Sequence, residues 1–260
     1  GAFASLVIGA ELLPTRPVLA AVLFAAAALE MVALARREMP KEAPLIPLDL
    51  LRADSFRFSV IASACCFAGQ TAGMVALPFY LQHGLGQDTL MAGLYMTAWP
   101  LTVAIAAPFA GRLADRVSTA WLSAVGGLCL ATGLGAAALW PLKGDPLLLV
   151  PLTMLCGLGF GLFNVANNRN MFLSAPNERS GAAGGMQGTA RLFGQTAGAV
   201  IMTLLFTLTS ADAAPQIGLG IGAVLTFVAG LVSMLRVSPT PPRGPVCQPA
   251  SLRTALAPNS

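Results

Sequence analysis

The chain has 260 residues, of which 56% are apolar and only 10% are charged. In a soluble domain about a quarter of the residues are charged, so this composition excludes an ordinary soluble protein. The net charge of +4 is small and comes from residues between apolar stretches. It therefore gives no reason to expect a nucleic-acid partner.

Seven apolar segments are long enough to cross a lipid bilayer. Each has about 17 to 26 residues, and a helix needs ~20 residues to span a hydrocarbon core about 30 Å thick. A soluble protein with so much uncovered apolar surface would aggregate. We therefore predict an all-α fold, a polytopic transmembrane helical bundle whose partner is the lipid bilayer. In chain order, the predicted spans are Val18–Leu34, Phe58–Leu81, Leu90–Ala110, Trp121–Leu142, Leu147–Phe172, Gly188–Ser210 and Ile217–Leu235.

The polar segments divide the chain further. Residues 1–13 are apolar but too short to span, and we interpret them as the end of a truncated transmembrane helix, so that the chain is the C-terminal part of a longer protein. The proline-containing connection 37–57 predicts a cytoplasmic linker. Residues 237–260, rich in proline and serine, predict a disordered cytoplasmic tail. Between these segments we expect an accessory transmembrane helix at 17–36 and a six-helix domain at 58–236.

Lysine and arginine are concentrated in every second connection. The opposite connections hold only Arg16 and Lys143. By the positive-inside rule, the basic connections face the cytoplasm, which predicts a bacterial inner-membrane protein with a cytoplasmic C-terminus. The basic set is Arg36, Arg37, Lys41, Arg52, Arg57, Arg112, Arg116, Arg179, Arg236, Arg243 and Arg253.

One arginine lies within a predicted span. Gln187, Arg191 and Gln195 repeat every four residues and share one helix face. Placing an arginine at the centre of a membrane helix costs about 2.5 to 3.5 kcal/mol. Arg191 therefore either faces a cavity, where it contacts substrate or acts in gating, or extends to the lipid headgroups. Both interpretations remain open.

Other polar and aromatic residues are candidates for a substrate cavity. Asn164 and Asn168 share a face of the fifth span, and we expect them to line an aqueous cavity, with hydrogen bonding between helices as the alternative. Tyr95 and Trp99 lie one turn apart on the third span. They either stack on an apolar or cationic ligand or pack between helices. The predicted cavity set is Tyr95, Trp99, Asn164, Asn168, Arg191 and Gln195.

Glycines at four-residue spacing predict close helix packing, because small residues one turn apart let backbones approach. Five such pairs occur: Gly69 with Gly73, Gly157 with Gly161, Gly184 with Gly188, Gly194 with Gly198, and Gly218 with Gly222. The sequence contains a single histidine, no Walker phosphate loop and no cluster of metal-binding residues. We therefore expect no enzyme activity, no metal site and no cofactor.

Several motifs point to a known family. The turn Gly111-Arg112-Leu113-Ala114-Asp115-Arg116 resembles the Gly-x-Leu-x-Asp-Arg loop of the major facilitator superfamily. Other motifs are similar to the ninth, tenth, twelfth and thirteenth helices of its fourteen-span drug:proton antiporter family. They are Leu77-Pro78-Phe79-Tyr80-Leu81-Gln82, Ala92-Gly93-Leu94, Trp99-Pro100-Leu101, Ala107-Pro108, Asn167-Asn168-Arg169, the run from Glu178 to Met186, and Arg191 with Gly194 and Gly198.

The resemblance implies the C-terminal portion of a proton-coupled multidrug exporter. Its six-helix domain would consist of two inverted three-helix repeats and bind a small hydrophobic or cationic substrate against the missing N-terminal half. That half would also supply the proton-coupling acids. The resemblance further implies a gating loop of Gly111, Arg112, Asp115 and Arg116. The alternatives are a transporter of one dedicated metabolite, a non-transporting membrane sensor or intramembrane enzyme, and a permease subunit of an ATP-driven pump.

Overall fold

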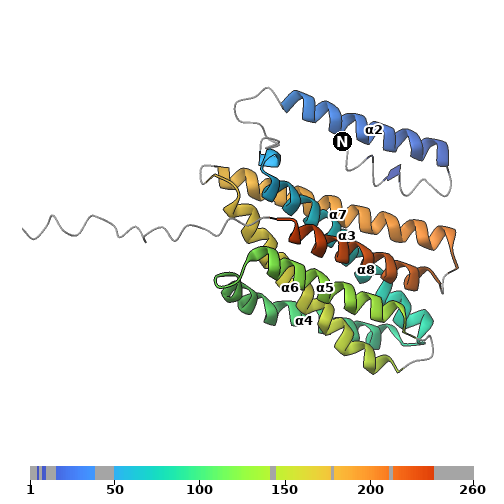
Figure 1. Ribbon diagram of the computed structural model, residues 1–260. Helices are drawn as coiled ribbons and strands as arrows, with labels where there is room; N and C mark the ends of the chain where they lie inside the picture. Colours follow the sequence, from blue (N-terminus) through green and yellow to red (C-terminus); the bar gives the residue numbers. More distant parts are fainter. Residues whose placement is uncertain are drawn as a thin grey trace, which may run out of the picture.

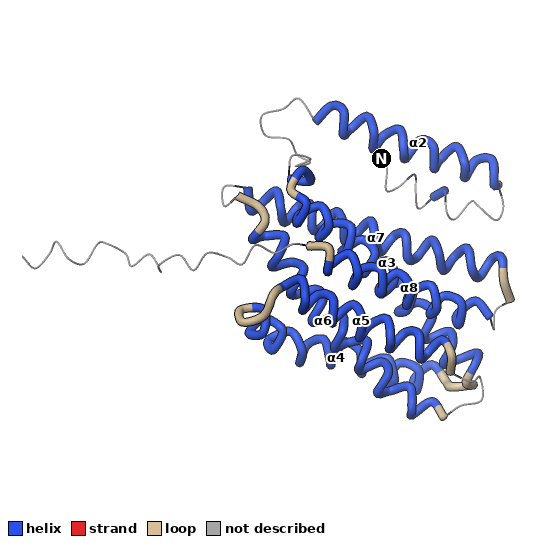
Figure 2. Tube along the Cα trace, viewed as in Figure 1, coloured by secondary structure: helices blue, strands red, loops and turns tan. Residues whose placement is uncertain are grey.

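The computed structural model describes residues 5, 8–9, 16–38, 50–140, 145–176, 179–210 and 213–236. Every regular element in these ranges is helical (Figure 2), which confirms the predicted all-α fold. In chain order, the elements are α2 (Pro17–Glu38), the short 3-10 helix η1 (Leu50–Arg52), α3 (Asp54–Phe79), the π-helical turn η2 (Tyr80–Gly84), α4 (Thr89–Ala114), α5 (Thr119–Ala138), the 3-10 turn η3 (Pro146–Leu148), α6 (Leu149–Leu173), α7 (Ser180–Leu208) and α8 (Ala213–Met234).

Six of the described helices, α3 to α8, are long and apolar enough to cross a membrane. They correspond to the six spans predicted from Phe58 onward. One boundary differs clearly, because α7 begins at Ser180 and not at Gly188. Residues 180–187 are rich in glycine and alanine. They are helical, but the sequence pattern did not mark them as part of a span because they are not apolar enough.

The predicted accessory helix corresponds to α2. Its apolar stretch, Val18–Ala27, is shorter than a membrane span, so its crossing of the bilayer remains a prediction. Residues 1–13 and the linker 37–57 lie largely outside the described residues, and the tail 237–260 lies wholly outside them.

The six long helices alternate in direction (Figure 1). The starts of α3, α5 and α7 therefore lie at the same end of the bundle as the C-terminal ends of α4, α6 and α8. We call this end the basic end, because Arg112, Arg116 and Arg236 lie there. Helix α3 packs against α7 and α8, while α6 packs against α4 and α5, and α5 packs against α8. The units α3–α5 and α6–α8 thus run in opposite directions with matching neighbours.

Glycines occur at two of the closest helix crossings. A Cβ atom at Gly194 would lie 2.5 Å from the carbonyl oxygen of Ala64, and one at Gly198 would collide with the carbonyl of Ala68. These contacts bring α7 against α3. In the same way, Gly157 and Gly161 lie against α4, where a Cβ at Gly157 would meet the carbonyl of Trp99. Only glycine leaves room for backbones at these distances.

The outer helices of the bundle differ from the central ones in burial. In the most apolar stretch of α4 and of α7, only 17% of the residues are buried, against 56% in α3 and 61% in α5. Exposed apolar side chains on α4 include Leu101, Ile105 and Phe109. Helices α4 and α7 therefore present the least covered faces of the bundle.

Candidate functional site

A half-buried stripe of three side chains runs along α6. Phe160, Asn164 and Asn168 repeat every four residues, so they share one face of the helix. The amide nitrogen of Asn168 donates to the Oδ1 of Asn164 at 3.1 Å. The Oδ1 of Asn168 is buried and accepts no hydrogen bond in the described part of the chain. Two amides and a phenyl ring thus form one half-buried face of α6.

A second stripe lies on α7. Arg191 is exposed, while Gln187 and Gln195, one turn to either side of it, are half-buried. The guanidinium carbon of Arg191 lies 5.5 Å from the ring centroid of Phe67 on α3. This is within the range of a cation–π contact.

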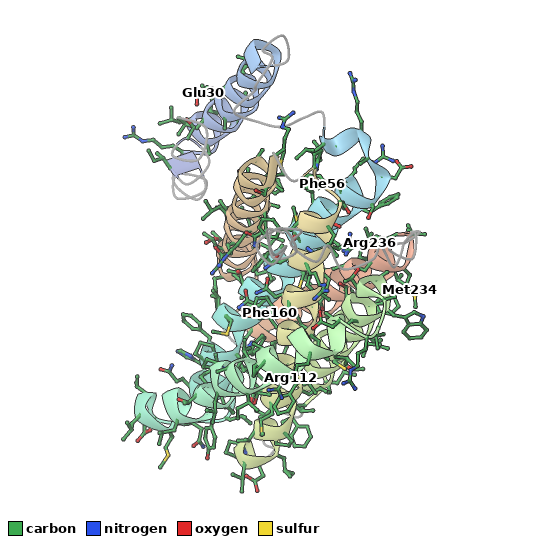
Figure 3. The ribbon with its side chains drawn as sticks, turned by 90° about the vertical axis from the view of Figure 1, so that its left-hand side faces the viewer. Glu30, Phe56, Arg112, Phe160, Met234 and Arg236 are labelled. Atoms are coloured by element: carbon green, nitrogen blue, oxygen red, sulfur yellow. The ribbon has the colours of Figure 1, made fainter. Side chains whose placement is uncertain are left out.

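Phe67 connects the two stripes. Its ring also meets the ring of Phe160 edge to face, with the centroids 5.6 Å apart; Phe160 is labelled in Figure 3, which looks at the bundle from the basic end. Arg191 of α7 and Phe160 of α6 therefore contact the same side chain of α3. The structure thus brings four of the predicted cavity residues, Asn164, Asn168, Arg191 and Gln195, into two stripes that flank one ring.

The two aromatic residues predicted on α4 lie in different surroundings. Trp99 is only 2% exposed and belongs to the packed interior. Its backbone lies against Gly157 and its ring lies near Gly73. Tyr95 is half-buried and packs against the same interior. In this structure Trp99 is therefore a packing residue, whereas Tyr95 retains some exposed surface.

The predicted gating loop lies at the basic end, between α4 and α5. Asp115, the C-cap residue of α4, accepts a hydrogen bond from the Nη1 of Arg169 on α6 at 2.5 Å. Both side chains of this ion pair are well exposed, Asp115 at 62% and Arg169 at 40%. Arg112 and Arg116 are exposed as well, and with Phe109 they line a hollow beside the loop. The loop is thus joined to α6 through one ion pair.

Sequence analysis did not identify a buried polar cluster at the same end. Asn167 is 1% exposed. Its amide nitrogen donates to the Oγ of Ser63 at 2.6 Å and to the carbonyl of Ser59 at 3.2 Å, and its Oδ1 accepts from the Nη2 of Arg236. Asn170 continues the cluster, donating to the Oγ of Ser59 at 2.8 Å and accepting from Thr119.

Arg236 is the charged member of this polar cluster. It follows α8, is labelled in Figure 3, and is 3% exposed. Its Nη2 also donates to the Oγ of Ser233 at 2.8 Å, whereas its Nε and Nη1 have no hydrogen-bond partner among the described residues. Burial lowers the pKa of Arg236 to about 9, which still leaves the side chain cationic at neutral pH. The sequence had placed this arginine among the loop charges, but Ser55, Ser59 and Ser63 at four-residue spacing were a visible signal of a polar face.

Comparison with known proteins identifies relatives over most of the chain. Residues 59–257 match the family model described as Major Facilitator Superfamily. The chain is 42% identical over 203 residues to the uncharacterized transporter YebQ of Escherichia coli, covering 78% of this chain and 44% of that protein. It is 30% identical over 158 residues to the riboflavin transporter RibZ of Clostridioides difficile, covering 61% of this chain and 35% of that protein.

A more distant relative carries a drug-efflux name. The multidrug efflux pump LfrA of Mycolicibacterium smegmatis is 24% identical over 188 residues, covering 72% of this chain and 37% of that protein. The chain thus spans less than half the length of each of these three relatives.

Proposed function

The chain belongs to the Major Facilitator Superfamily, and from this premise we propose that it is the C-terminal part of a proton-coupled multidrug exporter in the bacterial inner membrane. The exporter works by alternating access, with two halves rocking about a central site. This chain supplies one half, and an N-terminal half of the same transporter supplies the other. The fourteen-span architecture is part of the proposal and rests on the motifs from Leu77 to Gly198.

The observation that carries the proposal is the pair of polar stripes flanking Phe67. A membrane helix tolerates such residues where they face a cavity or a polar partner. Arg191 is exposed, and Asn164 and Asn168 on α6 are half-buried, as expected for one wall of a cavity that a second half completes. We assign Tyr95, Asn164, Asn168, Arg191 and Gln195 to this wall, and add Phe160.

Proton coupling is assigned to the other half. In the described parts of α3 to α8, the acids Asp54, Asp88, Asp115 and Asp145 all lie at helix ends, and His83 lies in the turn after α3. A group that carries protons across the membrane has to change its exposure between the two sides, which suits an acid within a span. We therefore place the coupling acid outside α3 to α8.

The basic end is proposed to be cytoplasmic, with the loop of Gly111, Arg112, Asp115 and Arg116 as a gate. The pair between Asp115 and Arg169 ties this loop to α6, the same helix that carries Asn164 and Asn168. Exposed ion pairs contribute only about 0 to 1 kcal/mol of stability. Such a contact can therefore break and reform during a transport cycle at little cost.

A transporter for one dedicated metabolite is the second candidate, and the similarity to a riboflavin transporter favours it. Proteoliposomes with an imposed pH gradient separate the two. The complete transporter should move several unrelated compounds, such as ethidium and riboflavin, whereas this chain alone should move none. Adding the N-terminal half as a separate chain should restore transport. Flux of riboflavin alone would identify the dedicated transporter, and proton-driven flux by this chain alone would contradict the two-half proposal.

A further inference from the structure

Arg191 is the one charge in the proposed cavity wall. Among the described residues, Asp54 pairs with Arg57 and Asp115 pairs with Arg169, and no carboxylate pairs with Arg191. The other residues of the wall are amides, Tyr95 and Phe160. The wall on this half is therefore electropositive.

The position of Arg191 along α7 makes this charge significant. It lies eleven residues after Ser180, the first of the 29 residues of α7. With a rise of 1.5 Å per residue, this is about 17 Å into a helix about 43 Å long. A guanidinium inside a membrane helix is costly unless it faces water, an opposite charge or the lipid headgroups, and in this proposal Arg191 faces the substrate cavity.

The guanidinium of Arg191 is positioned by Phe67, but its N–H groups are not used in hydrogen bonds with the described residues. Phe67 contacts it through the ring face, which needs no N–H group. Arg191 donates no hydrogen bond to the described residues, so its planar set of N–H donors can bind both oxygens of a carboxylate at once. The half-buried ring of Phe160 contacts the same Phe67 ring and provides an apolar surface in this wall.

We propose that the substrates this wall prefers are flat aromatic compounds that carry a carboxylate or a comparable oxyanion. This inference rests on the proposed function and names the substrate class of the same site. The oxyanion binds Arg191, the ring system lies against Phe160, and Asn164 and Gln195 hydrogen-bond to polar substituents. This assignment differs from the cationic substrate predicted from Tyr95 and Trp99, since Trp99 is buried and no acid on this wall can pair with a cation.

Three fluorescent probes of the same shape test the charge preference: anthracene carboxylate, anthracene methanol and anthracene methylammonium. Their efflux is followed in cells expressing the complete transporter. The wild type should export the carboxylate fastest. Arg191→Gln should slow carboxylate export about tenfold, as expected for loss of a charge-assisted pair, with methanol export little changed. Arg191→Lys should retain part of the preference, and Arg191→Glu should shift it to methylammonium.

The amount of transporter in the membrane is measured for every variant. A variant that folds poorly would show less transporter in the membrane and an equal decrease in the export of all three probes. Arg52→Gln removes a cytoplasmic positive charge far from the wall and should leave the preference unchanged. The proposed substrate class is wrong if the wild type exports the methylammonium probe fastest, or if Arg191→Glu does not change the preference. Neither result contradicts the proposal that the protein is an exporter. Absence of export of every probe, together with no flux of ethidium or riboflavin in proteoliposomes, overturns the proposed function itself.

Discussion

At the scale of single residues, Asn167 is the most constrained polar side chain described. It contacts α3 through Ser59 and Ser63, and the end of α8 through Arg236. A buried polar group is stable only while its partners are present. Arg236 already has two nitrogens without partners, so it depends strongly on its two acceptors, Asn167 and Ser233.

We expect Asn167→Ala to lower the free energy of unfolding by about 2 kcal/mol or more, because it leaves Ser63 and Arg236 without their shared partner. Thermal unfolding in detergent measures the change. Asn168→Ala is the matched control on the next residue, since its side chain bonds only Asn164. A loss from Asn168→Ala as large as that from Asn167→Ala would contradict the role assigned to the polar cluster.

At the scale of elements, helix crossings are set by where a Cβ atom can be accommodated. Along α7, Gly194 faces the backbone of α3, whereas Gly185 has no atom within 4 Å of the position a Cβ would take. The two residues therefore have the same backbone conformation but opposite surroundings.

Gly194→Ala should lower the free energy of unfolding by about 1 to 3 kcal/mol, because α7 must move away from α3 to relieve the overlap. Gly185→Ala should leave stability unchanged or raise it, because alanine favours a helix by up to about 1 kcal/mol over glycine. The two variants are compared by their melting temperatures in detergent. Equal effects would show that the α3–α7 contact tolerates an extra methyl group.

Sequence patterns predicted the six long helices and the polar residues of the two stripes, because the helical period alone determines which residues share a face. They did not determine what that face contacts. Trp99 is buried because Gly73 and Gly157 on other helices leave room for it. The sequence around Trp99 does not predict these contacts. Arg236 follows the last apolar residue of its span, as a loop charge would, yet it is buried and donates to Asn167 on another helix.

At the scale of the whole molecule, the alternating helices place the charges unevenly between the two ends. Arg112, Arg116, Arg169 and Arg236 lie toward one end, while the turn after α3 carries His83 and no lysine or arginine. The positive-inside rule assigns the former end to the cytoplasm.

Native Cys247, outside the described residues, should therefore be protected from an impermeant thiol reagent in intact cells, and a cysteine introduced by Gln87→Cys should react. The other native cysteines lie within the candidate spanning helices, so their labelling sets the background signal of the experiment. They are Cys65, Cys66, Cys129 and Cys156. Permeabilised cells should label both positions. Labelling of Cys247 in sealed cells with Gln87→Cys protected would reverse the orientation.

The polar cluster has a consequence for biosynthesis. Its members Ser63 and Asn167 are synthesised early and enter the bilayer with α3 and α6, whereas Arg236 is added only after α8. Until then, one amide oxygen of Asn167 lacks the donor that it has in the complete bundle. A chain that ended before residue 236 would keep all six long helices but leave the Oδ1 of Asn167 without its arginine donor. The polar contacts of the helical domain are therefore complete only when Arg236 has been added.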